Sequence, residues 1–259
     1  MILDVKTIND WINKGKEPDI LFWVGSAGSF DDRAKKITRA FVKIMNKAKV
    51  NFAILGLEES ASGDVAKRAG NEFLFQMQAL SNIQLLNSYN IKRIVTTCPH
   101  DYNTIKNEYK DLGGNYDVLH HTEYIFELIN QGELQLANNL KGKKITFHDP
   151  CYLGRGNGVF DTPRKLLKSI GLDLVEMKRS KSTSFCCGAG GAQMFKEPEK
   201  GREDININRT KEALATQTKL IATGCPFCNT MLTDGVKNIA EGSAEVLDIA
   251  ELIVLSEKL

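Results

Sequence analysis

Five of the six cysteines in this 259-residue sequence lie in its C-terminal half, in a pattern that few protein classes share. From the first of the five to the last, the pattern is C-x34-CC-x37-C-x2-C. Thiolates bind soft metal ions and iron-sulfur clusters, and they are the reactive groups of many redox proteins. The pattern therefore indicates metal binding or redox chemistry. We call these residues the cysteine set: Cys151, Cys186, Cys187, Cys225 and Cys228.

The number of cysteines bears on the identity of the metal. Five thiolates at one point repel one another unless a strongly positive centre lies between them. A tetrahedral zinc ion takes four ligands and leaves one thiol over. The usual cubane iron-sulfur cluster also takes four, so a fifth cysteine indicates an unusual cluster. Zinc bound by four of the five stays as the alternative, and a thiol-disulfide exchanger using Cys225 and Cys228 would leave Cys186 and Cys187 without a role.

Two glycines and one histidine adjoin the cysteine set. Gly188 and Gly190 belong to the run that follows Cys187, and a backbone without side chains can approach a cluster and direct N–H groups at its sulfurs. His148 precedes Cys151 by three residues, where its ring can either donate a hydrogen bond to the cofactor or serve a structural role. We therefore count Gly188, Gly190 and His148 as candidate neighbours of the cofactor, with no catalytic residue distinct from the cysteines.

The elements around the cysteines are predicted to bring them together. Strand-like segments at 145–150 and 220–222 lead into Cys151 and Cys225. Strand and helix signals alternate along the chain, as in the strand-like segment 20–24 followed by a helix opened by Asp31 and Asp32. This alternation predicts an α/β fold with mostly parallel sheets and the cysteines on strand-end loops, which gather at one edge of such a sheet.

Three sequence blocks carry a resemblance to a known family: HDPCYLGR at 148–155, FCCGAGG at 185–191 and GCPFC at 224–228. They resemble the cysteine-rich CCG domain found in heterodisulfide reductase and in the iron-sulfur subunits of lactate-utilisation, glycolate oxidase and anaerobic glycerol-3-phosphate dehydrogenase systems. The resemblance implies a non-cubane [4Fe-4S] cluster held by the cysteine set. It also implies that electrons pass to or from a disulfide, a quinone or another redox subunit.

The N-terminal half contains a second, degenerate copy of the pattern. TCPHDYNT at 97–104 parallels GCPFCNT at 224–230, and counting back by the C-terminal intervals reaches the other ligand positions. Because serine and alanine are poor ligands for iron, we expect one cluster and not two. A residual zinc site at Cys98, His100 and Asp101 is less favoured than a simply buried Cys98. The four positions that lack the expected cysteine are Ser26, Ser60, Ala61 and Asp101.

The two copies predict two pseudo-repeated α/β lobes. The polar stretch 138–144 has no periodicity, so we place the boundary there. The prediction is a degenerate CCG-like lobe at 1–138, which lacks most cluster ligands, and a lobe with the complete five-cysteine motif at 139–259.

Composition excludes several functional classes. Lys plus Arg number 34 against 32 Asp plus Glu, so the net charge of +2 offers no basic surface for nucleic acid. Charges interrupt the apolar residues at 1–6, which predicts no secretory signal, and no uncharged run approaches the roughly 18 residues of a membrane span. We therefore expect a cytoplasmic protein, with attachment to a membrane through a partner as the alternative.

Together these features predict an iron-sulfur oxidoreductase subunit of the heterodisulfide reductase-like or lactate and glycolate oxidase-like type. Its partner would be a ferredoxin-like iron-sulfur protein or a flavin-bearing redox subunit, with a quinone or a disulfide as ultimate acceptor. The competing hypothesis is a non-catalytic scaffold or docking subunit with a zinc-stapled C-terminal lobe.

Overall fold

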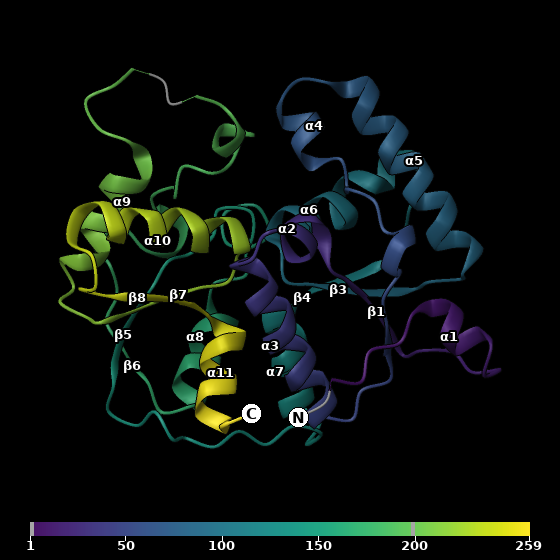
Figure 1. Ribbon diagram of the computed structural model, residues 1–259, viewed down its shortest axis with the longest axis horizontal. Coiled ribbons are helices and arrows are strands. Elements are labelled where there is room, and N and C mark those ends of the chain that lie inside the picture. Colours follow the sequence, from purple (N-terminus) through teal and green to yellow (C-terminus); the bar gives the residue numbers. More distant parts are fainter. Residues whose placement is uncertain (1–2, 198–199) are drawn as a thin grey trace. The chain divides into compact units, whose positions relative to one another are not determined.

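The computed structural model describes residues 3–197 and 200–259. The chain divides into two compact units, and the division falls between Leu134 and Gln135, whereas the sequence analysis placed it after residue 138. Each unit has its own parallel sheet and its own helices, so we describe the two units separately (Figure 1).

The N-terminal unit contains a four-stranded sheet in the order β2-β1-β3-β4, and every neighbouring pair is parallel. The central strands are buried along most of their length, as expected for a parallel sheet covered by helices. The strands are β1 (Ile20–Trp23), β2 (Phe52–Ala53), β3 (Arg93–Thr96) and β4 (Asp117–His120).

The helix expected after Asp31 and Asp32 is α3, and it buries apolar residues at helical spacing, among them Ala34, Ile37, Phe41 and Ile44. Asp31 accepts a hydrogen bond from the backbone N–H of Ala34, the first residue of α3, at 2.7 Å and so satisfies one of the free N–H groups at the start of the helix. The helical elements of this unit are α1 (Ile8–Ile12), α2 (Gly25–Phe30), α3 (Ala34–Lys47), η1 (Gly56–Glu58), α4 (Asp64–Arg68), α5 (Glu72–Ser88), α6 (Pro99–Asn103), η2 (Thr104–Glu108), η3 (Tyr109–Leu112) and α7 (His121–Asn130).

The C-terminal unit repeats this arrangement, with a four-stranded sheet in the order β6-β5-β7-β8. All of its pairs are parallel, and β5 lies between β6 and β7. The prediction of two pseudo-repeated α/β lobes with parallel sheets is therefore confirmed. The strands are β5 (Lys144–Phe147), β6 (Asp173–Leu174), β7 (Leu220–Thr223) and β8 (Glu245–Asp248).

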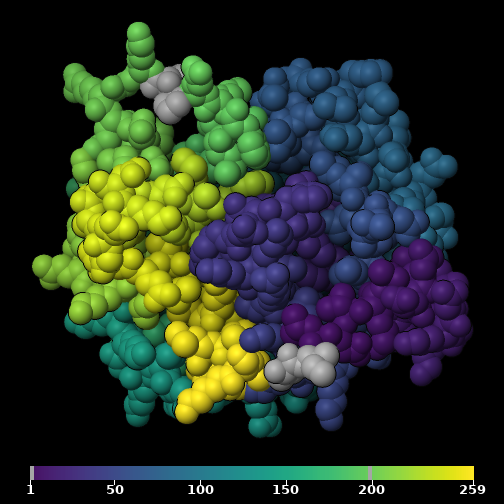
Figure 2. Space-filling view, in the orientation of Figure 1, coloured from purple at the N-terminus to yellow at the C-terminus, as the bar shows by residue number. Residues whose placement is uncertain are grey.

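The core of the C-terminal unit joins strands β7 and β8 to the helices packed on them. Ile221 and Val246 from the strands lie in one buried cluster with Ala213 of α9 and Leu232 of α10. On the face seen in Figure 2, the yellow C-terminal segment that contains α10 and α11 covers much of this unit. The helical elements are α8 (Asp161–Ser169), η4 (Lys181–Thr183), η5 (Gln193–Phe195), α9 (Ile205–Leu214), α10 (Pro226–Ala240) and α11 (Ile249–Glu257).

In the described part of the chain, no helix combines the length and the apolar character that crossing a membrane requires.

Candidate metal centre

The start of helix α10 positions two members of the cysteine set. Strand β7 ends at Thr223, Cys225 is the N-cap of α10, and Pro226 is its first residue. Proline suits this position because it has no N–H group to leave unsatisfied and its fixed φ matches the helix. Cys228 is the third helical residue, so both sulfurs lie in the first turn, where the helix dipole favours negative charge.

The other three cysteines come from two further connections at the same edge of the sheet. Cys151 lies in a series of turns after β5, in which the N–H of Gly156 donates to the Cys151 carbonyl at 3.0 Å. Cys186 and Cys187 lie on the long connection from β6 to α9, between the short turns η4 and η5. Only Cys151 and Cys225 therefore follow a strand closely, whereas the central pair lies well beyond the end of its strand.

The thiols of the whole cysteine set are joined by an unbroken series of side-chain contacts. The Sγ atoms of Cys187 and Cys228 are 3.2 Å apart. Three of the sulfurs are buried, and those of Cys151 and Cys186 are half-buried. The fold thus gathers all five cysteines at one place. The contacts run in order from Cys151 to Cys186, Cys187, Cys228 and Cys225.

Hydrogen bonds within the set divide the thiols into two kinds. Contacts from Cys151 and Cys187 lower the pKa of Cys186 far below its usual range. The contact with Cys186, together with burial, raises the pKa of Cys151 and of Cys187, and the contact with Cys187 raises that of Cys228. The contacts therefore favour negative charge on the sulfur of Cys186 and disfavour it on those of Cys151, Cys187 and Cys228. These thiols can lose their protons together only when a cation offsets the resulting charge.

An apolar wall closes one side of the centre. The buried sulfurs of Cys187, Cys225 and Cys228 form one cluster with Ala189, and three larger apolar side chains pack against them. Such a wall excludes water and lowers the local dielectric, which affects the potential of a bound redox group. The packing residues are Met194, Phe227 and Met231.

The two candidate glycines differ in their surroundings. The N–H of Gly188 donates to Sγ of Cys186 at 3.2 Å, and its φ of +92° is one that residues with a side chain rarely adopt. A Cβ added at Gly188 would lie 3.1 Å from Cβ of Ile205. A Cβ added at Gly190 would meet no described atom within 4 Å. Gly188 therefore contacts a cysteine sulfur and has a backbone conformation that favours glycine, whereas neither feature is found at Gly190.

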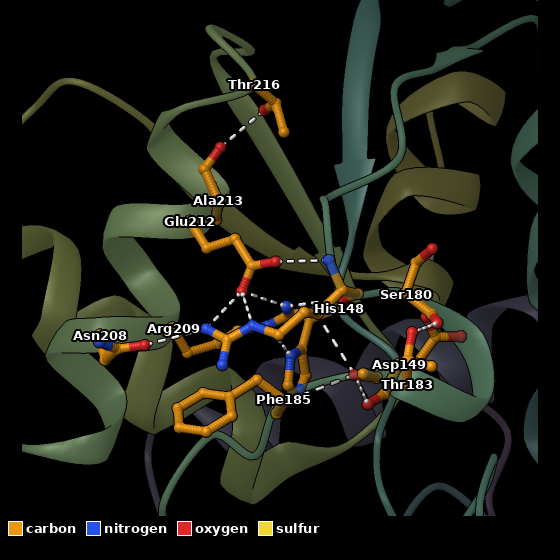
Figure 3. Close-up of polar contacts among 12 residues, drawn as sticks. His148, Asp149, Ser180, Thr183, Phe185, Asn208, Arg209, Glu212, Ala213 and Thr216 are labelled. Carbon is orange, nitrogen blue, oxygen red and sulfur yellow. Dashed lines mark hydrogen bonds and ion pairs between the residues drawn. The ribbon is translucent and has the colours of Figure 1, made fainter.

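His148 lies beside the sulfurs and is almost fully buried. One of its ring nitrogens is within 4.8 Å of the sulfurs of Cys187 and Cys228. Its Nδ1 accepts a hydrogen bond from Nε of Arg209 at 2.9 Å, and its Nε2 has no hydrogen-bond partner among the described residues (Figure 3). Burial and the positive charge of Arg209 lower the pKa of His148 to about 3, so the ring is neutral at physiological pH.

Asp149, the residue after His148, fixes the loops around the centre. Its carboxylate accepts two hydrogen bonds from Arg164, at 2.7 and 2.9 Å, and one from the backbone N–H of Lys181 at 2.7 Å. Its backbone carbonyl accepts from the hydroxyl of Ser184 at 3.1 Å, just before the Cys186–Cys187 segment. The bonds from Lys181 and Ser184 therefore tie the turn that carries Cys151 to the loop that carries Cys186, and the bidentate pair joins that turn to α8.

The residues that support the cysteine set were not predicted from the sequence. Asp149 lies in the first of the three cysteine blocks, but its type alone does not distinguish a structural ion pair from a surface charge. Arg164, Arg209 and Glu212 lie within helical segments rich in charge, where a solvent-exposed position is the ordinary expectation. The burial of Arg164 and Arg209 distinguishes them from surface residues, and the sequence contains no signal for it.

The equivalent region of the N-terminal unit holds a hydrogen-bond network. Asp101 accepts from the hydroxyl of Ser62 at 2.5 Å, and the thiol of Cys98 also bonds to it. Nδ1 of His100 instead contacts Asp64 at 2.9 Å. Within residues 3–197 and 200–259, His148, Cys187 and Cys228 of the C-terminal unit form a group whose donor atoms are close enough to hold a metal ion. No such group occurs around Cys98 in these residues.

The comparison with known families separates this chain from other α/β proteins. The family model of the CCG cysteine-rich domain matches the chain twice, at residues 20–106 and 145–233. The chain belongs to the CCG cysteine-rich domain family. The resemblance carried by the three cysteine blocks is therefore confirmed, and one match falls in each of the two units.

Relatives of this CCG protein extend well beyond the matched region. The chain is 49% identical over 255 residues to the probable iron-sulfur-binding oxidoreductase FadF of Bacillus subtilis, covering 98% of this chain and 36% of the relative. It is 44% identical to the EtfAB:quinone oxidoreductase of Syntrophomonas wolfei, covering 97% and 37%. Identity to one subunit of the dihydromethanophenazine:CoB–CoM heterodisulfide reductase of Methanosarcina barkeri is 32%, covering 91% and 58%. The chain thus spans less than two thirds of the length of each.

Proposed function

We propose that this CCG protein is part of an iron-sulfur oxidoreductase and transfers electrons through a single non-cubane [4Fe-4S] cluster. The cysteine set would hold the cluster in the C-terminal unit. The observation that carries the proposal is the unbroken series of sulfur contacts that joins all five cysteines at the edge of one sheet. Soft sulfur donors alone, with one more than zinc requires, favour an iron-sulfur cluster over zinc.

The protein's own residues would hold the cluster and control its environment. A bound cluster supplies the ability to accept and release single electrons. Cys186 receives the N–H of Gly188, a bond that stabilises negative charge on sulfur. Met194, Phe227 and Met231 would shield the buried side from water, and the half-buried Cys151 and Cys186 leave the other side nearer to solvent. Electrons would therefore enter or leave on the side of Cys151 and Cys186.

The N-terminal unit is proposed to carry no cluster. Its ligand positions are occupied by serine, alanine and aspartate, and Ser60 donates its hydroxyl hydrogen to Asn82 at 2.8 Å. Asp101 is engaged by Ser62, and the carboxylate of Asp64 engages His100. These side chains satisfy one another, so the unit is built to fold without a metal.

A redox partner must supply or remove the electrons. One relative is named an EtfAB:quinone oxidoreductase, and another belongs to a heterodisulfide reductase. We propose by analogy that the partner is a flavin-bearing or ferredoxin-like iron-sulfur protein or domain, and that the ultimate acceptor is a quinone or a disulfide. A location in the cytoplasm remains a prediction, with attachment to a membrane through a partner as the alternative.

The test is elemental analysis of the anaerobically purified chain with electron paramagnetic resonance of its oxidised and reduced forms. We expect about four irons and four acid-labile sulfides per chain, which is the stoichiometry of one cluster. Cys187→Ala should lose or alter the signal. Cys98→Ala is the matched control, because it removes the buried cysteine of the other unit and should leave iron, sulfide and signal unchanged.

The competing scaffold hypothesis predicts a different result. About one zinc per chain and no sulfide, even after reconstitution with iron and sulfide, would contradict electron transfer and support a zinc-stapled docking role. Loss of the cluster in Cys98→Ala as well as in Cys187→Ala would contradict the assignment of the cluster to the C-terminal unit.

A further inference from the structure

A buried arginine controls the histidine beside the cysteine set. Arg209 comes from α9, and Figure 3 shows its side chain extending to the ring of His148, which follows β5. The Nε atom of Arg209 donates to Nδ1 of His148 at 2.9 Å. Both residues are almost completely buried, so water does not compete for this bond.

This hydrogen bond determines where the imidazole carries its proton. A guanidinium group has only donors, so Nδ1 of His148 must present its lone pair to Arg209. A neutral imidazole has one N–H, which is therefore on Nε2. The assignment follows from the donor chemistry of Arg209.

The arrangement is the reverse of that around a metal-binding histidine. Such a histidine directs a lone pair to the metal and donates its other N–H to a carboxylate, a carbonyl or water. In His148 the nitrogen left without a partner among the described residues, Nε2, carries a hydrogen, and the ring lies beside the sulfurs of Cys187 and Cys228. Although its position near two cysteines suggests a ligand, the contact with Arg209 makes His148 a donor.

We propose that Arg209 is a positioning residue that holds His148 as an N–H donor to sulfur at the metal centre and thereby keeps it out of the ligand set. This inference rests on the proposed function for its redox consequence. Donation to sulfur stabilises the reduced, more negative form of a cluster and so raises its reduction potential. Because His148 cannot replace a cysteine, all five sulfurs remain available to the cluster.

The position of Arg209 is itself fixed by its neighbours. Its Nη1 donates to the carbonyl of Arg179 at 2.9 Å and to the carboxylate of Glu212 at 3.0 Å. Glu212 in turn accepts the backbone N–H of Arg179 at 2.5 Å and its Nε–H at 3.0 Å. Glu212 thus compensates the buried guanidinium charge, and the network leaves Nε of Arg209 directed at His148.

The first test determines the tautomer of His148 directly. Nitrogen-15 nuclear magnetic resonance of the histidine-labelled chain distinguishes protonated from unprotonated ring nitrogens, and His148→Gln assigns the signal among the four histidines. We expect the hydrogen on Nε2 in the wild type and in Arg209→Lys, which keeps a donor. Arg209→Met should release the ring to take up the Nδ1–H form. A wild-type ring protonated on Nδ1, or one unchanged in Arg209→Met, would overturn the proposal.

The second test measures the reduction potential of the reconstituted chain. Arg209→Met and His148→Leu should each shift the midpoint potential to more negative values, and the double variant should shift it no further than His148→Leu alone. Lys211→Met, at an exposed position of the same helix, should leave the potential unchanged. Shifts that add in the double variant would mean that Arg209 acts independently of His148 and would overturn the inference.

The two tests separate this inference from the proposed function. The tautomer can be measured in the zinc-loaded or metal-free chain, so it is decided even when no cluster forms. A correct tautomer in a chain that binds only zinc would overturn the proposed function and support the donor role of His148. A bound cluster together with a hydrogen on Nδ1 of His148 would support the proposed function and overturn the donor role of His148.

Discussion

Asp101 is the third residue of α6, the same helical position that Cys228 has in α10. Each follows by three residues an N-cap cysteine, Cys98 in one unit and Cys225 in the other. The strands before the two helices, β3 and β7, also have the same place in their sheets. The N-terminal unit therefore keeps the backbone of a ligand-bearing turn and places a hydrogen-bonded carboxyl group where the other unit has a thiol.

The buried carboxyl of Asp101 should make the stability of the N-terminal unit depend on pH. Burial raises the pKa of Asp101 from 3.8 to about 6. Because the pKa of this group is higher in the folded chain than in the unfolded chain, the group stabilises the fold at pH values below its unfolded pKa. This contribution is lost as the pH rises from about 4 to about 6. Asp101→Asn, which needs no proton, should therefore become more stable relative to wild type by up to about 3 kcal/mol over this range.

Urea unfolding followed by tryptophan fluorescence measures this effect in the correct unit. Both tryptophans, Trp11 and Trp23, lie in the N-terminal unit and are buried. Parallel pH profiles for wild type and Asp101→Asn would contradict the prediction and indicate that the carboxyl group titrates alike in the folded and unfolded states.

Substitution by alanine should have different effects at two glycines of the same loop. Gly188→Ala forces a side chain into a left-handed conformation and to within 3.1 Å of Ile205, so we expect a loss of about 1–3 kcal/mol and weaker metal retention. Gly190→Ala is the matched control and should leave both properties unchanged, because its Cβ meets no described atom within 4 Å. Metal content and thermal unfolding report the difference. Equal effects at both positions would refute a specific role for Gly188.

Removing the carboxylate of Asp149 should loosen the loops that carry the cysteines. Asp149→Asn leaves the buried Arg164 with Glu176 as its remaining charged partner, and we expect a loss of about 3 kcal/mol. Asp161→Asn is the control, because its 3.4 Å pair with Lys181 is exposed and should contribute less than about 1 kcal/mol. Far-ultraviolet circular dichroism during urea unfolding measures both changes. A smaller loss for Asp149→Asn than for Asp161→Asn would contradict the structural role.

The metal-free chain should have one preferred site for alkylation. Cys186 is half-buried, and hydrogen bonds from Cys151 and Cys187 lower its pKa, so its thiolate is present at neutral pH. Iodoacetamide below one equivalent should therefore modify Cys186 first, at a rate that changes little between about pH 6 and pH 8. Peptide mass spectrometry identifies the modified residue. Initial modification of Cys151, which is also half-buried but has a raised pKa, would show that the thiolate lies elsewhere.

Much of the fold and the convergence of the five cysteines could be predicted because both follow from local patterns. The alternation of strand and helix signals indicated two parallel sheets, and the repeated turn sequences indicated that the two halves are copies. The ends of some helices and the burial of individual apolar side chains were harder to predict, because they depend on how neighbouring elements pack. Helix α2 and the exposure of Phe73 and Met77 on α5 depend on which apolar faces find partners, and periodicity alone does not specify that.

Residue types and their spacing were enough to indicate the family, the two-lobed α/β architecture and the five cysteines that the fold brings together at one edge of a sheet. The role of His148, by contrast, depends on a contact that forms only in the folded chain. Its partner Arg209 is 61 residues away in the chain, and folding buries that arginine against the imidazole. A hydrogen bond between residues so distant in sequence depends on how α9 packs against the sheet, and it fixes the proton of His148 on Nε2.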